Sequence, residues 1–293
     1  MKNIKYLFFA LRPKQWIKNL FIFLPLVFGK KLFIYPVNLR VIIAFFLFSI
    51  TASVVYLIND IIDIEKDKLH PTKRLRPIAS GKLTVREAWI AAAILGGVFI
   101  ASSFLLDIYF GIVVASYIVF NILYSKILKD KVIIDVFCIG VFFLLRIIAG
   151  SIIANVQISH WIIFMVVLLA LFLGFNKRRQ ELCVLGKEAV SHRRALTRYN
   201  LYFIDQMVSV ITASIVIAYM LYTVDARTVK EFGTNHLMYS IPFVYYGIFR
   251  YLYLIHKIRK EGDPTRILLS DRMMRINIIL WISVCISVIY FGL

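Results

Sequence analysis

Apolar stretches about twenty residues long recur along nearly the whole of this 293-residue chain. About 20 residues of α-helix cross a bilayer, and a backbone inside lipid has to satisfy its hydrogen bonds within its own helix. A hydrophobic content of 61% and a mean hydropathy of +0.81 exceed those of soluble domains. We therefore predict an all-α integral membrane protein with about nine transmembrane helices, over residues 20–37, 40–58, 86–105, 109–127, 133–153, 159–176, 206–224, 237–256 and 273–291.

The connections between these stretches are short. They leave no room for a separate soluble domain, and neither an internal repeat nor a low-complexity tract interrupts the pattern. The sequence therefore predicts a single polytopic domain over residues 1–293.

The positive charges lie mostly in alternate connections. Of the 35 Lys and Arg residues, 28 fall in the N-terminal segment and in the loops around 60–87, 125–131, 177–205 and 257–275, and five fall on the opposite side. Because positively charged short loops stay in the cytoplasm, we predict a multi-pass protein of the inner or plasma membrane, with its N-terminus cytoplasmic and its C-terminus outside. The net charge of +19 is then mostly this positive-inside bias, concentrated where anionic lipid heads and phosphates lie, and it requires no nucleic acid partner.

A cluster of acids follows the second apolar stretch. On a continuous helix, Asp60, Asp63 and Asp67 fall within about 60° of one another, whereas Glu65 points away. Carboxylates that converge in this way repel each other unless a hard cation lies between them. Mg²⁺ takes such carboxylates as ligands together with oxygens of substrate phosphates. We predict a magnesium site here; the alternative is a solvated acidic helix end.

Basic and polar side chains that suit phosphate accompany the acids. Lys73, Arg74 and Arg76 follow them in a loop whose two prolines and glycine exclude one continuous helix. In the entry segment, Lys14 and Lys18 share a helical face, with polar Gln15 and Asn19 beside them. Both sets predict phosphate contacts at the cytoplasmic face, and for the two lysines the alternative is a positive-inside anchor.

Two further charged groups lie farther along the chain. Asp135 and Arg146 fall inside one predicted span and share a face, although a rise of about 16 Å is too long for a direct salt bridge. Asp135 lies near the cytoplasmic end, where it could join the metal site, and Arg146 either serves the site or pairs with helix carbonyls. Lys177, Arg178 and Glu181 share a helical face, and Glu181 either takes part in the site or only neutralises the bases. Asp271 is expected to cap the last helix.

The pattern of Asn59, Asp60, Asp63 and Asp67 resembles the first Asp-rich motif of the UbiA prenyltransferase superfamily. The resemblance narrows to its decaprenyl-phosphate phosphoribosyltransferase branch through the segments Arg12–Asn19, Tyr124-Ser125-Lys126 before Asp135, Leu145-Arg146 with Ala149-Gly150, Lys177-Arg178 with Glu181-Leu182, and Asp271-Arg272. The second Asp-rich motif of ordinary superfamily members is missing, because the loop after the sixth span holds only Glu181, Glu188 and Asp205 among many bases.

The resemblance implies a UbiA-like bundle with a cytoplasmic-facing active site. The implied reaction is Mg²⁺-dependent transfer of 5-phosphoribosyl from phosphoribosyl diphosphate to a polyprenyl phosphate, with release of pyrophosphate. The alternative is a UbiA-type prenyltransferase that joins a polyprenyl diphosphate to an aromatic acceptor. A transporter or lipid flippase is a third hypothesis, but nearly all the unusual charge lies on one side. The implied partners are both phosphorylated substrates and the lipid bilayer, and a homo-oligomer is possible.

The patterns and the resemblance together give the predicted site residues. The metal ligands are Asp60, Asp63 and Asp67, which are also catalytic. The other catalytic residues are Lys126, Arg146, Lys177 and Glu181. The substrate-binding residues are Lys14, Gln15, Lys18, Asn19, Asn59, Lys73, Arg74, Arg76, Tyr124, Asp135, Arg178 and Tyr199.

Overall fold

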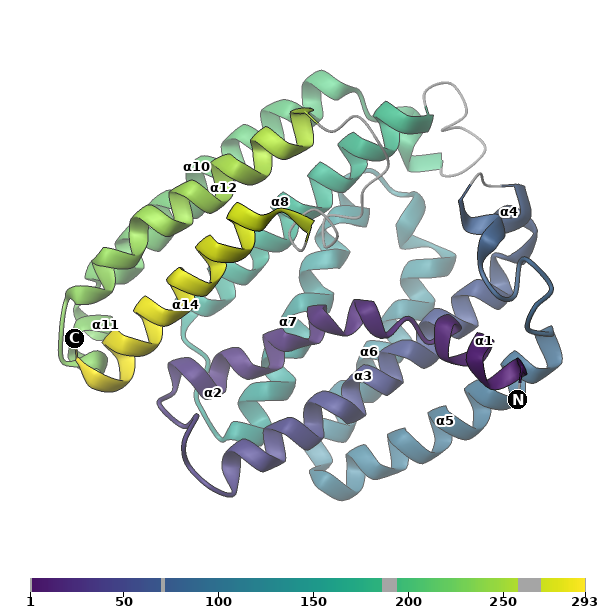
Figure 1. The fold of residues 1–293 in the computed structure, drawn as a ribbon, viewed down its shortest axis with the longest axis horizontal. Coiled ribbons are helices and arrows are strands. Elements are labelled where there is room, and N and C mark those ends of the chain that lie inside the picture. The colour runs from purple at the N-terminus through teal and green to yellow at the C-terminus, as the bar shows by residue number, and fades with distance from the viewer. Residues whose placement is uncertain (1, 70–71, 186–193, 258–269, 293) are drawn as a thin grey trace. The chain divides into compact units, whose positions relative to one another are not determined.

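The computed structural model describes residues 2–69, 72–185, 194–257 and 270–292, and these ranges contain helices and no strand. The helices form two compact units, one of residues 1–128 with 145–158 and one of residues 129–144 with 159–293. Helix α7, Ile134–Ala154, begins in the second unit and ends in the first (Figure 1). The single polytopic domain stays a prediction.

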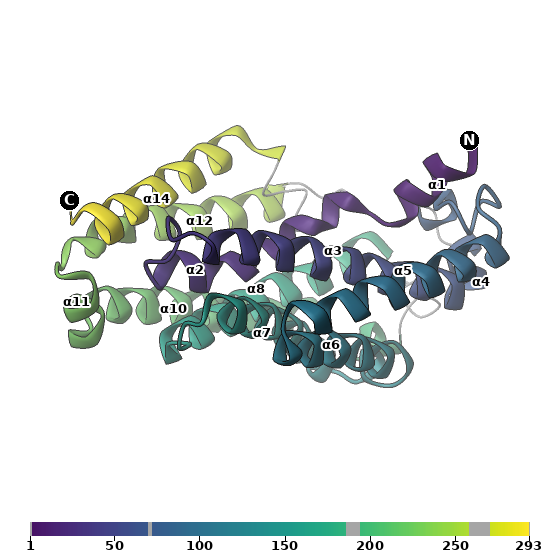
Figure 2. The same cartoon turned by 90° about the horizontal axis from the view of Figure 1, so that it is seen from below.

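The first unit is built on the long helix α3. Its elements in chain order are α1 (Lys2–Ala10), the 3₁₀-helix η1 (Pro13–Phe23), α2 (Leu24–Phe28), α3 (Val37–Ile62), α4 (Ile64–Leu69), η2 (Lys73–Leu75), α5 (Val85–Leu106) and α6 (Ile108–Lys126). The 26-residue helix α3 packs against α5, α6 and η1, and Figures 1 and 2 show α5 running alongside it.

The second unit continues from the first half of α7. Its elements are α8 (His160–Leu185), η5 (Arg194–Arg198), α10 (Leu201–Val224), α11 (Ala226–Phe232), η6 (His236–Ser240), α12 (Ile241–Lys257) and α14 (Arg272–Phe291); a short η3 (Leu128–Asp130) precedes it. Helix α8 packs against α10, and α12 packs against α14. Asp271 accepts a hydrogen bond from the Met274 backbone N–H at 2.8 Å, which confirms the predicted cap of the last helix.

Seven of the nine predicted spans coincide with helices that are long and apolar enough to cross a membrane. The first predicted span is displaced, because the chain is helical over residues 13–28 and turns after Gly29, where Lys30 has a positive φ. Pro13 stands at the first helical position and starts this segment earlier than hydropathy alone indicated. The eighth span consists of η6 and the 17-residue α12.

In the first unit, the segments that were predicted to be cytoplasmic meet at one end. Ser125 at the end of α6 donates a hydrogen bond to the Asn59 side chain near the end of α3, at 2.9 Å. At the other end, Arg40 near the start of α3 donates to the Leu106 carbonyl, at 3.2 Å. The predicted alternation of the loops therefore holds within this unit, while the side of the membrane on which each end lies stays a prediction.

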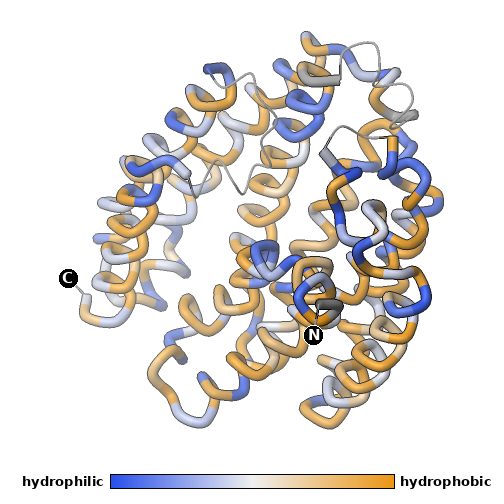
Figure 3. Tube along the Cα trace, turned by 45° about the vertical axis from the view of Figure 1, so that its right-hand side comes forward, coloured by the Kyte–Doolittle hydropathy of each residue, from blue (hydrophilic) through white to orange (hydrophobic). Residues whose placement is uncertain are grey.

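The helices are apolar on their outer surfaces as well as between helices. In α5, Ile90, Ile94 and Val98 are each more than half exposed and recur every four residues. Figure 3 shows hydrophobic residues along the helices and hydrophilic residues concentrated in the connections. A helix that is apolar all round is stable when lipid covers its outer face, as expected for a multi-pass membrane protein.

Candidate active site

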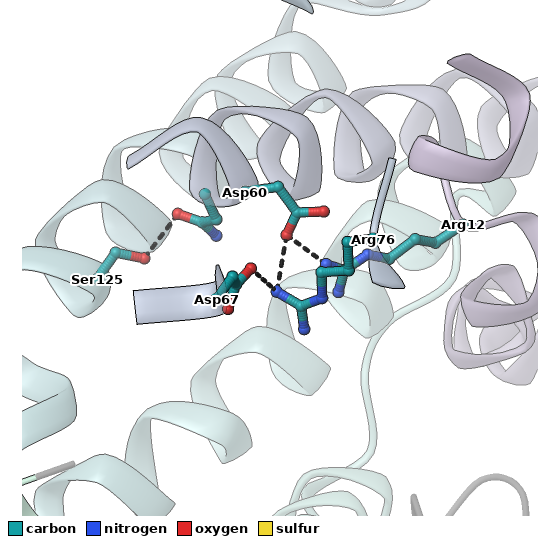
Figure 4. A network of polar contacts seen from close by, with 6 residues as sticks. Arg12, Asp60, Asp67, Arg76 and Ser125 are labelled. Carbon is teal, nitrogen blue, oxygen red and sulfur yellow. Dashed lines mark hydrogen bonds and ion pairs between the residues drawn. The ribbon is translucent and has the colours of Figure 1, made fainter. Parts of the chain in front are cut away.

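The last turn of α3 and the segment after it bring two of the three predicted acids together. Arg76 lies between them, with its Nη1 atom 3.0 Å from Asp60 Oδ1 and 2.6 Å from Asp67 Oδ2 (Figure 4). Both carboxylates are almost fully buried, whereas the Arg76 side chain is 27% exposed. One guanidinium thus neutralises two acids and still reaches solvent.

A compact loop holds Arg76 in place. Ile78 and Leu83 are buried in the cluster formed with α1, α3 and α5, and Gly81 adopts a positive φ that allows the tight turn between them. A capping box between Thr84 and Glu87 then starts α5. The loop predicted between the prolines and the glycine is therefore ordered by its apolar side chains.

A second arginine approaches Asp60 from the entry segment. Arg12 forms an ion pair with Asp60 Oδ1 (Figure 4). Its guanidinium also lies 5.2 Å from the centre of the Tyr56 ring. Arg12 has a φ of 52° directly before Pro13. Left-handed backbone costs about 1–2 kcal/mol in a residue with a side chain, so the surrounding contacts fix this conformation.

Burial and charge act against each other in this cluster. Burial raises the pKa of the Asp67 carboxyl above its usual value, and Arg76 and Lys73 oppose that rise. Asp60 Oδ1 receives both arginine contacts, but the buried Asp60 Oδ2 has no hydrogen-bond partner in the part of the chain that the structure describes. A buried carboxylate oxygen without a partner is costly, and a hard divalent cation is a ligand that would satisfy it. The residues present therefore fit a divalent cation.

Asp63 differs from its two neighbours. It caps α3 at a turn, although the Asp63 and Asp67 N–H groups still bond to the carbonyls four residues earlier, so the helical phase continues. Asp63 is half-buried. Within the described ranges, no three His, Cys, Asp or Glu side chains converge to hold a metal ion. The role of Asp63 as a third ligand stays a prediction.

The other predicted residues of the first unit differ in how far their side chains are exposed. Lys14, Arg74 and Lys126 are exposed, and Lys126 follows the Ser125 that bonds to Asn59. Gln15, Lys18, Lys73 and Tyr124 are half-buried.

Asn19 and Arg146 lie deeper, among apolar helices. Arg146 Nε donates to Asn19 Oδ1 at 2.7 Å, and Arg146 Nη2 donates to the Tyr117 hydroxyl at 3.2 Å. The guanidinium also lies 5.0 Å from the centre of the Tyr117 ring and 5.3 Å from that of Phe48. These bonds go to side chains, where the alternative interpretation expected helix carbonyls.

The second unit holds its own buried charge network. Arg178 Nε lies 2.8 Å from Asp135 Oδ2, and Arg178 also pairs with Glu181. The Tyr199 hydroxyl donates to Asp135 Oδ1 at 2.8 Å and accepts from the Ile133 N–H at 2.6 Å. Burial raises the pKa of the Tyr199 hydroxyl, and the neighbouring Asp135 carboxylate adds to that rise.

This network bears on three predictions. Asp135 contacts Arg178 and Tyr199 of its own unit, and its part in a metal site stays a prediction. The pairing of Glu181 with Arg178 agrees with the neutralising alternative. Lys177 is exposed beside this network.

The centres of the two long basic loops, at residues 186–193 and 258–269, lie outside the described residues.

Among the side chains that sequence reasoning missed are Arg12 and Tyr117, which contact predicted residues, and Tyr56, which lies against Arg12. Arg12 was visible only as part of the entry segment, because nothing in a sequence marks a left-handed arginine. Tyr56 gives a clearer signal, since it lies four residues before Asp60 and thus on the same helical face. Tyr117 gives none, because an aromatic residue in an apolar span is indistinguishable from a packing residue.

Comparisons with known proteins agree with this architecture. The decaprenyl-phosphate phosphoribosyltransferase of Mycolicibacterium smegmatis is 32% identical over an alignment of 301 positions, which covers 97% of this chain and 92% of that protein. The protein of the same name from Corynebacterium glutamicum is 30% identical and covers 96% and 86%. A UbiA homolog from Archaeoglobus fulgidus, solved with bound GPP and Mg²⁺, superimposes with a TM-score of 0.68 at 18% identity, over 97% of this chain and 99% of that one.

A family model matches the sequence of this chain directly, in agreement with these relatives and with the fold. The sequence model of the UbiA prenyltransferase family covers residues 21–177, which include Asp60, Asp63, Asp67, Arg76, Arg146 and Lys177. The match spans more than half of the chain, and the helices carry the hydropathy that such a membrane protein needs. The chain is therefore a multi-pass membrane transferase that belongs to the UbiA prenyltransferase family.

Proposed function

We propose that this transferase moves 5-phosphoribosyl from phosphoribosyl diphosphate to a polyprenyl phosphate, with Mg²⁺ as its cofactor. The observation that carries the proposal is the buried pair Asp60 and Asp67 with Arg76 between them, at the end of an apolar bundle. Similarity to relatives named decaprenyl-phosphate phosphoribosyltransferase, over nearly the whole chain, supports the choice of substrates.

In the proposed reaction, an oxygen of the lipid phosphate forms a bond to C1 of the ribose, and the bond between C1 and the pyrophosphate oxygen breaks. The nucleophile is already an anion, so the enzyme needs no strong general base. Its main tasks are to align two anions that repel each other and to neutralise their charge.

Asp60, Asp67 and Asp63 would hold the Mg²⁺, and the unpartnered Asp60 Oδ2 is the atom best suited to it. When bound, Mg²⁺ stabilises the negative charge of the diphosphate leaving group. Arg12 and Arg76 are about one-quarter exposed, so their guanidinium groups can also contact phosphate oxygens.

Basic and polar side chains would surround the phosphates. In the first unit these are Lys14, Lys18, Lys73, Arg74 and Lys126, with Asn59 and Tyr124. In the second unit, Lys177, Arg178, Glu181, Asp135 and Tyr199 stay predicted site residues. The apolar helices would accept the isoprenoid chain, whose phosphate would lie at the charged end.

The test is transfer of label into lipid by the purified protein in proteoliposomes. Radiolabelled phosphoribosyl diphosphate, Mg²⁺ and a polyprenyl phosphate should give label in the organic phase and free pyrophosphate in the aqueous phase. An Asp60→Asn, Asp67→Asn double variant serves as the control and should give neither. No transfer by the wild-type protein, together with prenylation of an aromatic acceptor from a prenyl diphosphate, would refute the proposal in favour of the alternative.

A further inference from the structure

Helix α3 carries a stripe of polar side chains that leads to the carboxylates. Ser49, Ser53, Tyr56 and Asp60 are spaced by four, three and four residues, so they lie on one face of the helix. Ser49, Ser53 and Asp60 are buried in an otherwise apolar span. Polar groups in such a place need partners, and the partners show what the stripe does.

The 3₁₀-helix η1 supplies these partners. A 3₁₀-helix has three residues per turn, so Trp16, Asn19 and Ile22 lie on one face. Trp16 Nε1 donates to Ser53 Oγ at 2.9 Å, and Asn19 Nδ2 donates to Ser49 Oγ at 2.9 Å. Three residues of 3₁₀-helix rise about as far along the axis as four residues of α-helix, so the spacing of Trp16 and Asn19 on η1 matches the spacing of Ser53 and Ser49 on α3.

The contacts continue to both ends of the segment. Toward the acids, Arg12 lies over Tyr56 and pairs with Asp60. At the other end, Asn19 Oδ1 accepts from Arg146, so both polar atoms of its amide are engaged. We call the four side chains between these ends, Trp16, Asn19, Ser49 and Ser53, the polar seam.

We propose that the polar seam positions Arg12 against Asp60, so that its members are positioning residues for the transfer reaction. Eleven residues of 3₁₀-helix are unusual, because runs longer than three or four are uncommon. Relaxation to an α-helix would shorten the rise from about 2.0 to about 1.5 Å per residue. Over the seven residues from Arg12 to Asn19, Arg12 would move by about 3.5 Å, which is more than a hydrogen bond tolerates.

The inference rests on the proposed function, and a double-mutant cycle tests it. Ser53→Ala should lower kcat/KM for the phosphoribosyl donor by about fivefold, the change expected for the loss of one hydrogen bond between uncharged groups. Ser53→Thr keeps the hydroxyl and should recover most of the loss. The matched control is Ser103→Ala, which removes a buried hydroxyl that, among the described residues, bonds only to the Phe99 carbonyl of its own helix.

The cycle distinguishes positioning from general stabilisation. If the seam acts through Arg12, Ser53→Ala should cause almost no further loss in an Arg12→Ala background, or in Arg12→Lys if Arg12→Ala falls below detection. The same fivefold loss in both backgrounds would overturn the proposal.

Hydrogen–deuterium exchange of the substrate-free protein gives a readout that does not depend on turnover. Ser49→Ala and Ser53→Ala should each speed exchange of the amides at residues 14–19 and leave α10 unchanged. Unchanged exchange at 14–19 would overturn the seam itself. Faster exchange in a protein that shows no phosphoribosyl transfer would support the seam and refute the proposed function.

Discussion

Gly150 on α7 lies against the backbone of η1, and its replacement by alanine tests how η1 is held. A Cβ atom built on Gly150 would lie 2.0 Å from the carbonyl oxygen of Ile22, 2.8 Å from its carbonyl carbon and 3.1 Å from its Cα. Real Cβ atoms essentially never approach within 3.0 Å, and all three neighbours belong to the backbone of a fully buried residue. No side-chain rotation can therefore relieve the contact.

The expected cost follows from two opposing effects. The Ile22 carbonyl has to move by about 1 Å, and overpacking of this kind in a well-packed interior costs about 1–3 kcal/mol. A backbone obstacle favours the upper end of that range. Alanine in place of glycine in the middle of a helix returns about 1 kcal/mol. The net loss in the free energy of unfolding should therefore be about 2 kcal/mol.

Equilibrium unfolding in mixed micelles, by titration with a denaturing detergent, measures this difference. Gly140→Ala is the matched control, because Gly140 lies on the same helix and a Cβ atom there would be 4.0 Å from a methyl group of Val167. The control should be as stable as the wild type or slightly more stable. Equal stability of the two variants would show that η1 does not lie against Gly150 and would refute the reasoning.

Three further results are expected. Asp60→Ala should abolish turnover while the protein still inserts and folds, and EDTA should do the same to the wild type until Mg²⁺ is restored; activity close to the wild type would refute the metal site. Asp135→Asn should lower the free energy of unfolding by about 3–5 kcal/mol, because it breaks a buried pair, whereas Asp205→Asn in the more exposed pair with Arg179 should cost at most about 1 kcal/mol. In a Cys-free background, an impermeant thiol reagent applied to intact cells should label a cysteine at Asn235 and not one at Ser80; the reverse labelling would invert the predicted topology.

The long helices and the acid cluster could be predicted from the sequence, because both depend on local patterns. Seven spans agree to within five residues at their ends, apart from the longer C-terminal extension of α8, since hydropathy over about twenty residues reports directly on burial in lipid. The acids were expected to converge because they share a helical face, and the backbone bonds of Asp63 and Asp67 preserve that phase across the turn. Asp60 and Asp67 indeed lie on either side of one arginine.

The entry segment could not be predicted in the same way, because its conformation depends on distant contacts. Its sequence has ordinary apolar content, and nothing in it distinguishes 3₁₀ from α geometry. The distinction arises from Ser49 and Ser53, thirty or more residues away, and from Gly150 on α7. The position of Arg12 beside Asp60 follows from that geometry and was missed for the same reason.

In the proposed function, the acids and the arginines of the first unit would let one cluster accept both a cation and a phosphate. Each buried carboxylate is neutralised by a guanidinium that is itself about one-quarter exposed. If a phosphate draws Arg12 or Arg76 away, Asp60 and Asp67 are left buried with less positive charge around them, and their affinity for a divalent cation rises. If a cation occupies the acids first, the arginines lose their partners and become better phosphate donors. By reciprocity, the two ligands strengthen each other's binding. A diphosphate accompanied by Mg²⁺ supplies both at once, which suits the phosphoribosyl donor of the proposed reaction.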